Sequence, residues 1–272
     1  MNDAEVVPPL PGVGIPPDQL WPGPEAVPIL ACARSSPHRP RWDLVGRRGK
    51  EDGSGGTDVF VVEAEGWCLK TSMRRRFPKR HDAQEAMRVL GDSKRRLGAW
   101  MPSHSALAVS EGHGGDWWLW TICPWLTTLR TRMTAAESLG DEAALGAVLG
   151  VYAEAATASL RMALAQHVVL DVHPSNFGFG GPALHYLDDH IAVGSSLPGI
   201  GHALLQRIEE YAELPGAIVR YLALLERALL TLSPIERAQI GLAEAFEQTL
   251  AQSEGAQRAK ERLVRFSSRN AR

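Results

Sequence analysis

The 272-residue sequence has few cysteines and no long apolar run, and both absences exclude whole classes of protein. Its three cysteines, Cys32, Cys68 and Cys123, are widely separated and form no CxxC pair, so neither a disulfide framework nor a zinc site is expected. No run approaches the roughly 18 apolar residues that cross a membrane, and the first ten residues lack the regions of a signal peptide. We therefore expect a protein of the reducing cytoplasm with no membrane segment.

Charge of either sign is not in large excess, because 29 Lys and Arg residues face 31 Asp and Glu residues. This balance gives no reason to expect binding to nucleic acid. One local basic run occupies residues 74–80 and continues through basic positions up to Arg96. The run suits an acidic partner or a substrate phosphate, but such runs are more often solvated faces.

Ten of the eighteen prolines fall in residues 1–41. This composition is typical of an extended, polyproline-like arm. We therefore expect residues 1–41 to form an N-terminal arm rather than a packed element.

The rest of the chain predicts an α+β protein whose strands precede most of its helices. Short β-type runs separated by Gly-rich turns predict an antiparallel sheet of five strands at residues 41–46, 58–63, 67–70, 107–109 and 117–122. One helix begins near Asp82 within this first lobe, residues 42–126. The second lobe, residues 127–272, is expected to be mostly helical, with helices at 141–166, 204–211, 217–232 and 234–253 and a basic amphipathic tail at 258–272.

Residues 167–190 carry the strongest functional signal. A β-type triplet, Val168 to Leu170, leads to Asp171, and Pro174 forces the following residues out of helix. Asp171 and Asn176 are thus expected on an irregular loop, where each alone is also typical of an ordinary Asx turn. A Gly- and Pro-rich turn and a short apolar strand follow, and the strand ends on Asp188 and Asp189.

Residues 171–176, Asp-Val-His-Pro-Ser-Asn, and the hairpin that ends on Asp188 together resemble the catalytic loop and metal-binding Asp of the protein-kinase-like phosphotransferases. The loop is most similar to those of aminoglycoside and choline phosphotransferases and of atypical bacterial kinases. The resemblance implies a two-lobed kinase-like fold that uses ATP and Mg²⁺. It implies Asp171 as the base that accepts the proton of an attacking hydroxyl, and Asn176 and Asp188 as metal ligands, with Asp189 as the fallback.

The same resemblance implies nucleotide-binding residues in the first lobe. Lys70 ends a β-type run 101 positions before Asp171 and would bind the α- and β-phosphates. Glu85 would pair with Lys70, although Asp82 and Glu85 also have the spacing of a helix-capping box. A degenerate Gly-rich turn would cover the phosphates with Gly53, Gly55 and Gly56.

The chain departs from the family pattern at two positions. Val169 stands where the family usually has His or Tyr, and Asp-Phe-Gly is replaced by Asp188, Asp189 and His190. No Ala-Pro-Glu triplet closes an activation segment, so the resemblance favours a small-molecule kinase or a compact, atypical protein kinase, and the hydroxyl acceptor stays unidentified. Two alternatives remain open: a pseudokinase that acts as a nucleotide-binding or protein-interaction module, and a metal-dependent hydrolase built on Asp171, His173, Asp188, Asp189 and His190.

Overall fold

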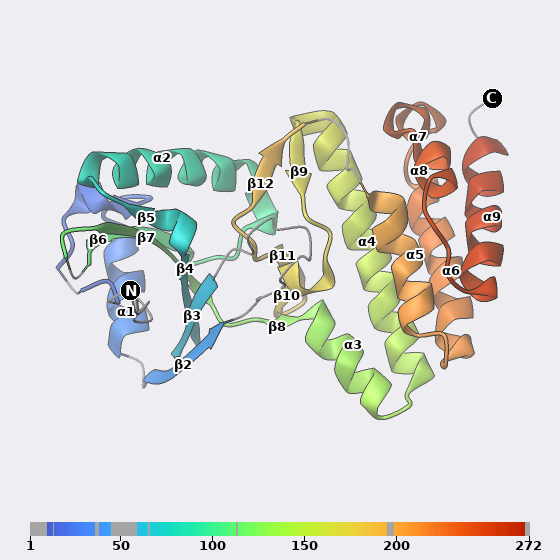
Figure 1. Ribbon diagram of the computed structural model, residues 1–272, viewed down its shortest axis with the longest axis horizontal. Helices are drawn as coiled ribbons and strands as arrows, with labels where there is room; N and C mark the ends of the chain where they lie inside the picture. The colour runs from blue at the N-terminus through green and yellow to red at the C-terminus, as the bar shows by residue number, and fades with distance from the viewer. Residues whose placement is uncertain are drawn as a thin grey trace, which may run out of the picture. The chain divides into compact units, whose positions relative to one another are not determined.

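The computed structural model describes residues 10–12, 14–35, 38–44, 59–64, 66–112, 114–194 and 199–269. The chain divides into two compact units, Met1–Trp125 and Leu126–Arg272, and the boundary lies one residue before the predicted one. The first unit contains a sheet with helices on it and the second is mainly helical (Figure 1). The α+β class predicted from the sequence is therefore confirmed.

Within the described residues, the first unit contains a seven-stranded antiparallel sheet rather than the predicted five strands. Its strand order is β1-β6-β7-β4-β3-β2, and β5 pairs with β7. The five predicted strands correspond to β2, β3, β4, β6 and β7, and two-residue strands β1 and β5 are additional. The bounds are β1 Leu20–Trp21, β2 His38–Leu44, β3 Val59–Ala64, β4 Trp67–Ser72, β5 Arg76–Phe77, β6 Ala106–Glu111 and β7 Trp117–Pro124.

Two helices, α1 (Ala26–Ser35) and α2 (Arg80–Arg96), cover opposite faces of this sheet (Figure 1). Because side chains alternate across a strand, each strand supplies residues to both apolar cores. Leu69, Trp120 and Ile122 pack with Leu30 on the α1 side. On the α2 side, the core contains Trp21, Ala83, Met87, Leu107, Val109 and Leu119.

The predicted N-terminal arm is wrong for residues 14–35, which are packed into the first unit, and for residues 38–41, which belong to β2. Leu20 and Trp21 form β1 and are 4% and 7% exposed, and Ala26, Leu30 and Ala33 of α1 are buried. The prolines are compatible with this packing because they sit where no backbone N–H is needed, as Pro17 does at the start of the 3₁₀ helix η1 (Pro17–Gln19) and Pro28 in the first turn of α1. The number of prolines therefore predicted the wrong structure for this segment. The apolar residues spaced three or four positions apart were the better indication of a packed helix.

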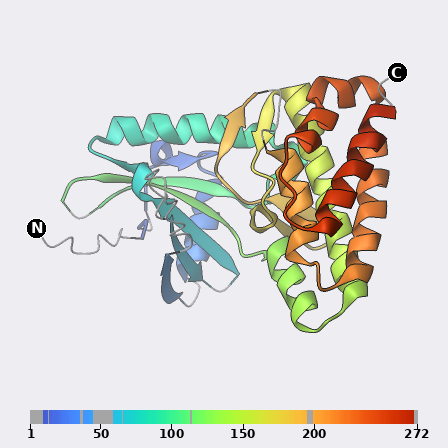
Figure 2. The same cartoon turned by 45° about the vertical axis from the view of Figure 1, so that its right-hand side comes forward.

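The second unit is organised around α4 (Glu142–Gln166), which packs against α3 and α6 (Figure 2). Gly146 and Gly150 allow the close approach of α6, since a Cβ at either would lie 2.8 Å from Cδ of Arg220 or 2.4 Å from Cδ1 of Leu224. Among the described helices α4 alone is long and apolar enough to cross a membrane, but 61% of its most apolar window is buried, as in a core helix. The remaining helices are α3 Leu129–Ser138, α5 Ile200–Glu210, α6 Pro215–Leu230, α7 Pro234–Ile240, α8 Leu242–Glu247 and α9 Glu254–Arg269.

Two small antiparallel sheets complete the second unit as described. One joins β11 (Ala183–Tyr186), β10 (Phe177–Gly180) and β8 (Thr127–Thr128), and the other joins β12 (Ile191–Val193) and β9 (Val168–Leu170). The loop from Asp171 to Asn176 connects β9 to β10, and the 3₁₀ turn η4, Pro174–Asn176, forms its second half. Short 3₁₀ helices η2 (Met73–Arg75) and η3 (Gly98–Trp100) flank β5 and α2 in the first unit.

Candidate functional site

Two strand pairings bring the predicted catalytic and metal residues of the second unit together. Leu170 of β9 lies opposite Ile191 of β12. Asp171 and His190 are therefore the first residues beyond this end of the two paired strands. Phe177 of β10 lies opposite Tyr186 of β11. The same end of the β10–β11 pair therefore presents Asn176 and the segment that runs through Leu187 to Asp188.

Hydrogen bonds at this end fix Asn176 in the loop. The backbone N–H of Leu187 donates to the carbonyl oxygen of Asn176 at 2.7 Å. The side-chain Nδ2 of Asn176 donates to the backbone carbonyl of Asp171 at 3.1 Å. Because the amide nitrogen is used in this way, the side-chain oxygen of Asn176 is the atom of this amide that could bind a metal ion.

Tyr186 joins the two loops through its hydroxyl. The hydroxyl accepts the backbone N–H of Asp171 at 3.1 Å and donates to the carbonyl of His190 at 3.0 Å. Its ring is fully buried and packs edge-on against Phe177, with ring centroids 5.5 Å apart. Burial, and next the carboxylate of Asp188, raises the pKa of the Tyr186 hydroxyl far above its ordinary value, so the hydroxyl stays protonated and able to donate.

The carboxylate of Asp171 is exposed, and its Oδ1 accepts the backbone N–H of His173 at 3.1 Å. This is the Asx-type turn expected for an ordinary loop aspartate, and it also fixes the direction of the carboxylate. Nδ1 of His173 in turn accepts the N–H of Ser175 and caps η4. The structural and functional interpretations of Asp171 are therefore compatible.

Asp188 lies partly buried just after β11, and its Oδ1 accepts the backbone N–H of Asp189 at 2.8 Å. The carboxylates of Asp188, Asp171 and Asp189 each contribute to the raised pKa of the Tyr186 hydroxyl. In the part of the chain that the structure describes, three or more His, Cys, Asp or Glu side chains nowhere form a group able to hold a metal ion. A di-metal hydrolase centre requires such a group.

A glycine of β10 is needed for the hairpin to lie this close to the preceding chain. A Cβ at Gly178 would be 2.7 Å from Cδ1 of Leu187 and 2.9 Å from Cβ of Leu126. Leu187 directly precedes Asp188, so the approach that Gly178 permits also positions the predicted metal ligand.

Lys70 lies on β4, directly opposite Thr121 of β7. Its neighbour Leu69 belongs to the core beneath α1, so Lys70 is on the face that α2 covers. The predicted lysine is therefore on the side of the sheet where a helix residue can approach it.

Glu85 does not make the predicted pair with Lys70. It binds Arg88 in the same helix, and its side chain is 51% exposed. The reason is the position of Glu85 on the helix. Ala83, Met87 and Gly91 form the buried stripe of α2, and Glu85 lies outside this stripe on the exposed side. The capping-box alternative is also wrong, because α2 begins after Lys79 with no side-chain cap. Gly53, Gly55 and Gly56 lie outside the described residues.

At least four of the nine Lys and Arg residues of the basic run form ion pairs within the first unit. Arg76, Arg80, Arg88 and Arg95 each bind a carboxylate, from Asp116, Asp18, Glu85 and Asp92. Three of these arginines also lie over tryptophan rings, as Arg76 does over Trp118, Arg80 over Trp117 and Arg95 over Trp21. These contacts favour a structural role for the run over a role in binding an acidic partner.

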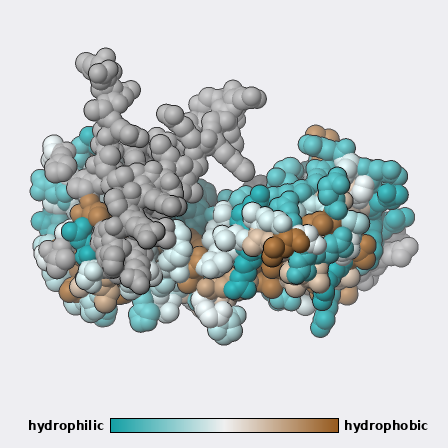
Figure 3. Space-filling model, turned by 90° about the horizontal axis from the view of Figure 1, so that it is seen from below, coloured by the Kyte–Doolittle hydropathy of each residue, from teal (hydrophilic) through white to brown (hydrophobic). Residues whose placement is uncertain are grey.

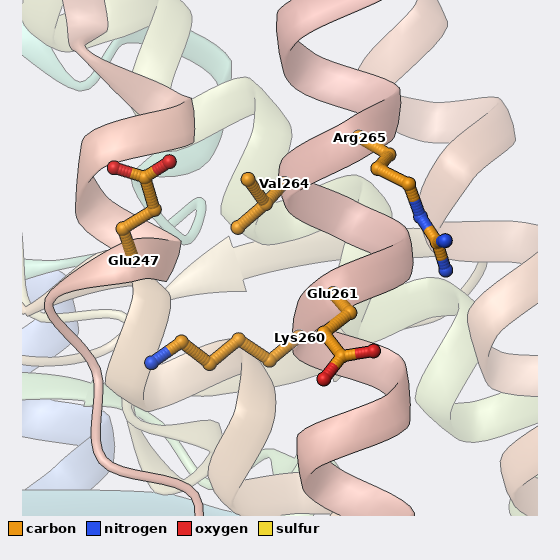
Figure 4. Close-up of a pocket in the computed structure, with 5 residues that line it drawn as sticks. All are labelled: Glu247, Lys260, Glu261, Val264 and Arg265. Atoms are coloured by element: carbon orange, nitrogen blue, oxygen red, sulfur yellow. The ribbon is translucent and has the colours of Figure 1, made fainter.

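A pocket of about 430 Å³ lies between α8 and α9. The residues that line it come later in the sequence than all of the predicted site residues. Glu247 comes from α8, while Lys260, Glu261, Val264 and Arg265 come from α9, and Lys260 extends toward α8 (Figure 4). Lys260 Nζ donates to the carbonyl of Thr249 at 2.7 Å.

The second unit is mainly hydrophilic on the face in Figure 3, with smaller hydrophobic groups.

No sequence pattern singled out Tyr186, which lies in the expected short apolar strand, or Phe177. The only local signal was the position of Tyr186 two residues before Asp188, and nothing in the sequence indicates which atoms its hydroxyl meets. Comparisons of this chain with models of protein families, with curated proteins and with solved structures found no match.

Proposed function

We propose that the protein is an ATP- and Mg²⁺-dependent phosphotransferase with a two-lobed, protein-kinase-like fold, which moves the γ-phosphate to a hydroxyl of a small molecule or protein. One observation carries the proposal: the hydrogen-bonded convergence of Asp171, Asn176 and the chain leading to Asp188 at one end of two strand pairs. The division into two units supports the two-lobed fold, and a cytoplasmic location is part of the same proposal.

The donor atoms at this end of the hairpin fit a magnesium ion. The side-chain oxygen of Asn176 and the carboxylate of Asp188 are hard oxygen ligands, which Mg²⁺ prefers. The hydrogen bonds at Asn176 Nδ2 and Asp188 Oδ1 restrict the rotation of both groups before any ligand binds. The chemistry that bound Mg²⁺–ATP supplies is a phosphoryl group activated for in-line transfer.

The chain's own residues would then have distinct roles. Asp171, with Oδ1 held by the N–H of His173, accepts the proton of the attacking hydroxyl on its carboxylate. Asn176 and Asp188 hold the metal, and the Lys70 ammonium binds phosphate oxygens. Tyr186 ties the Asp171 loop to the chain just after Asp188, because its hydroxyl is bonded to the N–H of Asp171 and to the carbonyl of His190.

The test is a transfer screen with labelled ATP and Mg²⁺ against peptides, sugars, aminoglycosides and the protein itself. We expect one acceptor class to be labelled by the wild type and not by an Asp171→Ala variant of unchanged melting temperature. Equal labelling by both proteins would overturn the assignment of Asp171.

A pseudokinase is the second candidate, and the position of Glu85 favours it. Its carboxylate is held by Arg88 on the exposed side of α2, whereas a kinase of the resembled family pairs this residue with the strand lysine. A pseudokinase would show a melting temperature raised by nucleotide without any phosphoryl transfer. Turnover of ATP that requires Asp171 would exclude it.

A further inference from the structure

The structure places two of the three cysteines directly opposite each other on neighbouring strands. Cys68 of β4 and Cys123 of β7 are partners in the antiparallel register, although 55 positions separate them in the sequence. Cys32 is on α1, outside this strand pair. All three are thiols in the structure.

The hydrogen-bond pattern fixes the type of site that the two cysteines occupy. The N–H of Trp125 donates to the carbonyl of Gly66 at 2.9 Å, which makes Gly66 and Trp125 a hydrogen-bonded pair. Hydrogen-bonded and non-hydrogen-bonded pairs alternate, so Pro124, which has no N–H, falls at a non-bonded pair and Cys68 with Cys123 at the next bonded pair. Cα atoms in such pairs are about 5.5 Å apart, within the range of about 4.4–6.8 Å that a disulfide spans.

We propose that Cys68 and Cys123 form a redox-sensitive thiol pair, which a peroxide oxidises to a cross-strand disulfide within the first unit. This modification site is assigned without reference to the proposed phosphotransferase activity. Cβ atoms of facing strand residues are about 4.5–5.5 Å apart, somewhat farther than the roughly 3.5–4.5 Å of a relaxed disulfide. The bond therefore draws the strands together, and the resulting strain makes it easily reduced, as regulatory disulfides are.

The oxidation proceeds in two steps. Cys68 is partly exposed and Cys123 is 6% exposed, so peroxide reaches Cys68 first. The Cys68 thiolate attacks one peroxide oxygen, the O–O bond breaks, and a sulfenic acid and one water form after proton uptake. The Cys123 sulfur then attacks the sulfenic sulfur, the S–O bond breaks, and a second water leaves with the Cys123 proton. Two electrons pass from the two sulfurs to the peroxide.

The position of the bond gives it a way to affect the first unit. Lys70 is two residues beyond Cys68, and its partner Thr121 is two residues before Cys123. Closing the strands at the cysteine pair therefore changes the spacing at the adjacent hydrogen-bonded pair, which contains the predicted phosphate-binding lysine.

The test counts thiols in the full-length protein. Reduced protein is treated with hydrogen peroxide, denatured and alkylated with iodoacetamide, and its intact mass is measured. We expect three alkylated cysteines before oxidation and one, Cys32, afterwards, with a peptide cross-link between Cys68 and Cys123. Three alkylated cysteines after oxidation, or a cross-link that involves Cys32, would overturn the proposal.

Three variants separate the pair from general thiol reactivity. Cys32→Ser is the matched control and should still lose both remaining thiols, whereas Cys68→Ser should keep both of its thiols. Cys123→Ala, checked for folding by circular dichroism, should retain a sulfenic acid on Cys68 that dimedone labels, and Cys68→Ser serves alone if this buried variant unfolds. Millimolar glutathione should restore all three thiols of oxidised wild type, and a bond that survives this treatment would contradict the strained geometry.

Discussion

The backbone N–H of Asp171 donates to the hydroxyl of Tyr186, 3.1 Å away, and this bond links the predicted base to a residue 15 positions later. The same hydroxyl donates to the carbonyl of His190. Val169, where the resembled family has His or Tyr, lacks any side-chain hydrogen-bonding group. The Tyr186 hydroxyl, on the neighbouring hairpin, makes hydrogen bonds that the Val169 side chain cannot make.

Replacing Tyr186 by Phe removes both hydrogen bonds and leaves the ring in place. We expect a loss of about 1–2 kcal/mol in the free energy of unfolding, about a tenfold fall in kcat, and little change in KM for ATP. Amide hydrogen exchange at Asp171 should accelerate. The matched control is Tyr221→Phe, which removes the hydroxyl of an equally buried tyrosine, bonded to the Leu204 carbonyl, and should lower stability alone. Identical kcat and identical Asp171 exchange in the two variants would refute the role of Tyr186.

Asp171→Asn tests the base without breaking the loop. The amide oxygen can still accept the N–H of His173, so the turn and the melting temperature should be retained. Loss of the proton acceptor is expected to lower the transfer rate by about 10²–10⁴-fold, measured with labelled ATP. Nucleotide binding is the internal control and should persist; a transfer rate close to wild type would show that another group takes the proton.

Asp188→Asn and Asp189→Asn distinguish the metal ligand from its neighbour. We expect Asp188→Asn to raise the magnesium concentration needed for half-maximal transfer by at least about tenfold, because it removes a charged oxygen ligand. Asp189→Asn should leave this concentration nearly unchanged. The opposite result in a magnesium titration would assign the metal to Asp189.

Gly178→Ala is expected to destabilise the protein by about 1–3 kcal/mol, because the added Cβ would meet Leu187 and Leu126 at under 3.0 Å. Denaturant unfolding measures the change. The matched control is Gly255→Ala in α9, where the nearest atom to the new Cβ is Ser253 Oγ at 3.9 Å, and a small gain in stability is expected from helix propensity. Equal effects of the two substitutions would show that Leu187 moves aside freely.

The capping box of α7 predicts an acid-dependent loss of stability. The backbone N–H of Ser233, and next its side chain, holds the pKa of Glu236 below its usual 4.5. A depressed carboxylate pKa means that this contribution is fully present above about pH 4.5 and is lost as pH falls through the lower, folded-state value. Glu236→Gln should therefore reduce stability at pH 7 and make it less dependent on pH below 4.5, measured by thermal unfolding between pH 3 and 7. Parallel pH profiles of variant and wild type would argue against the capping carboxylate.

Local patterns in the sequence were sufficient where neighbours along the chain decide the structure. The Val168–Leu170 strand and a tight hairpin between β10 and β11 follow from backbone preferences of a few residues, and both are present. Two details differ: Gly178 and Gly180, expected in the turn, lie in β10, and Pro174, expected to force the following residues out of helix, begins the 3₁₀ turn η4. The long helix α4 was found for the same reason, with Asp141 as its N-cap.

Predictions that needed a partner far along the chain were the ones that failed. The prolines suggested an extended arm, but Leu20 and Trp21 instead pair with β6 and pack against α1 and α2. Burying their apolar side chains in this way lowers the free energy more than leaving them exposed in an arm. Glu85 has the residue type and the approximate position of the family's glutamate. It lies outside the buried stripe of α2, however, so its side chain is on the side of the helix away from the sheet.

The sequence by itself determined that an aspartate, an asparagine and a second aspartate follow strands on short irregular segments. Only the tertiary structure decided that the Tyr186 hydroxyl binds two of those segments, and that Cys68 faces Cys123 across two strands. The physical reason is register: shifting a strand by one residue turns every side chain to the other face, and the packing of distant segments, rather than any local pattern, sets that register.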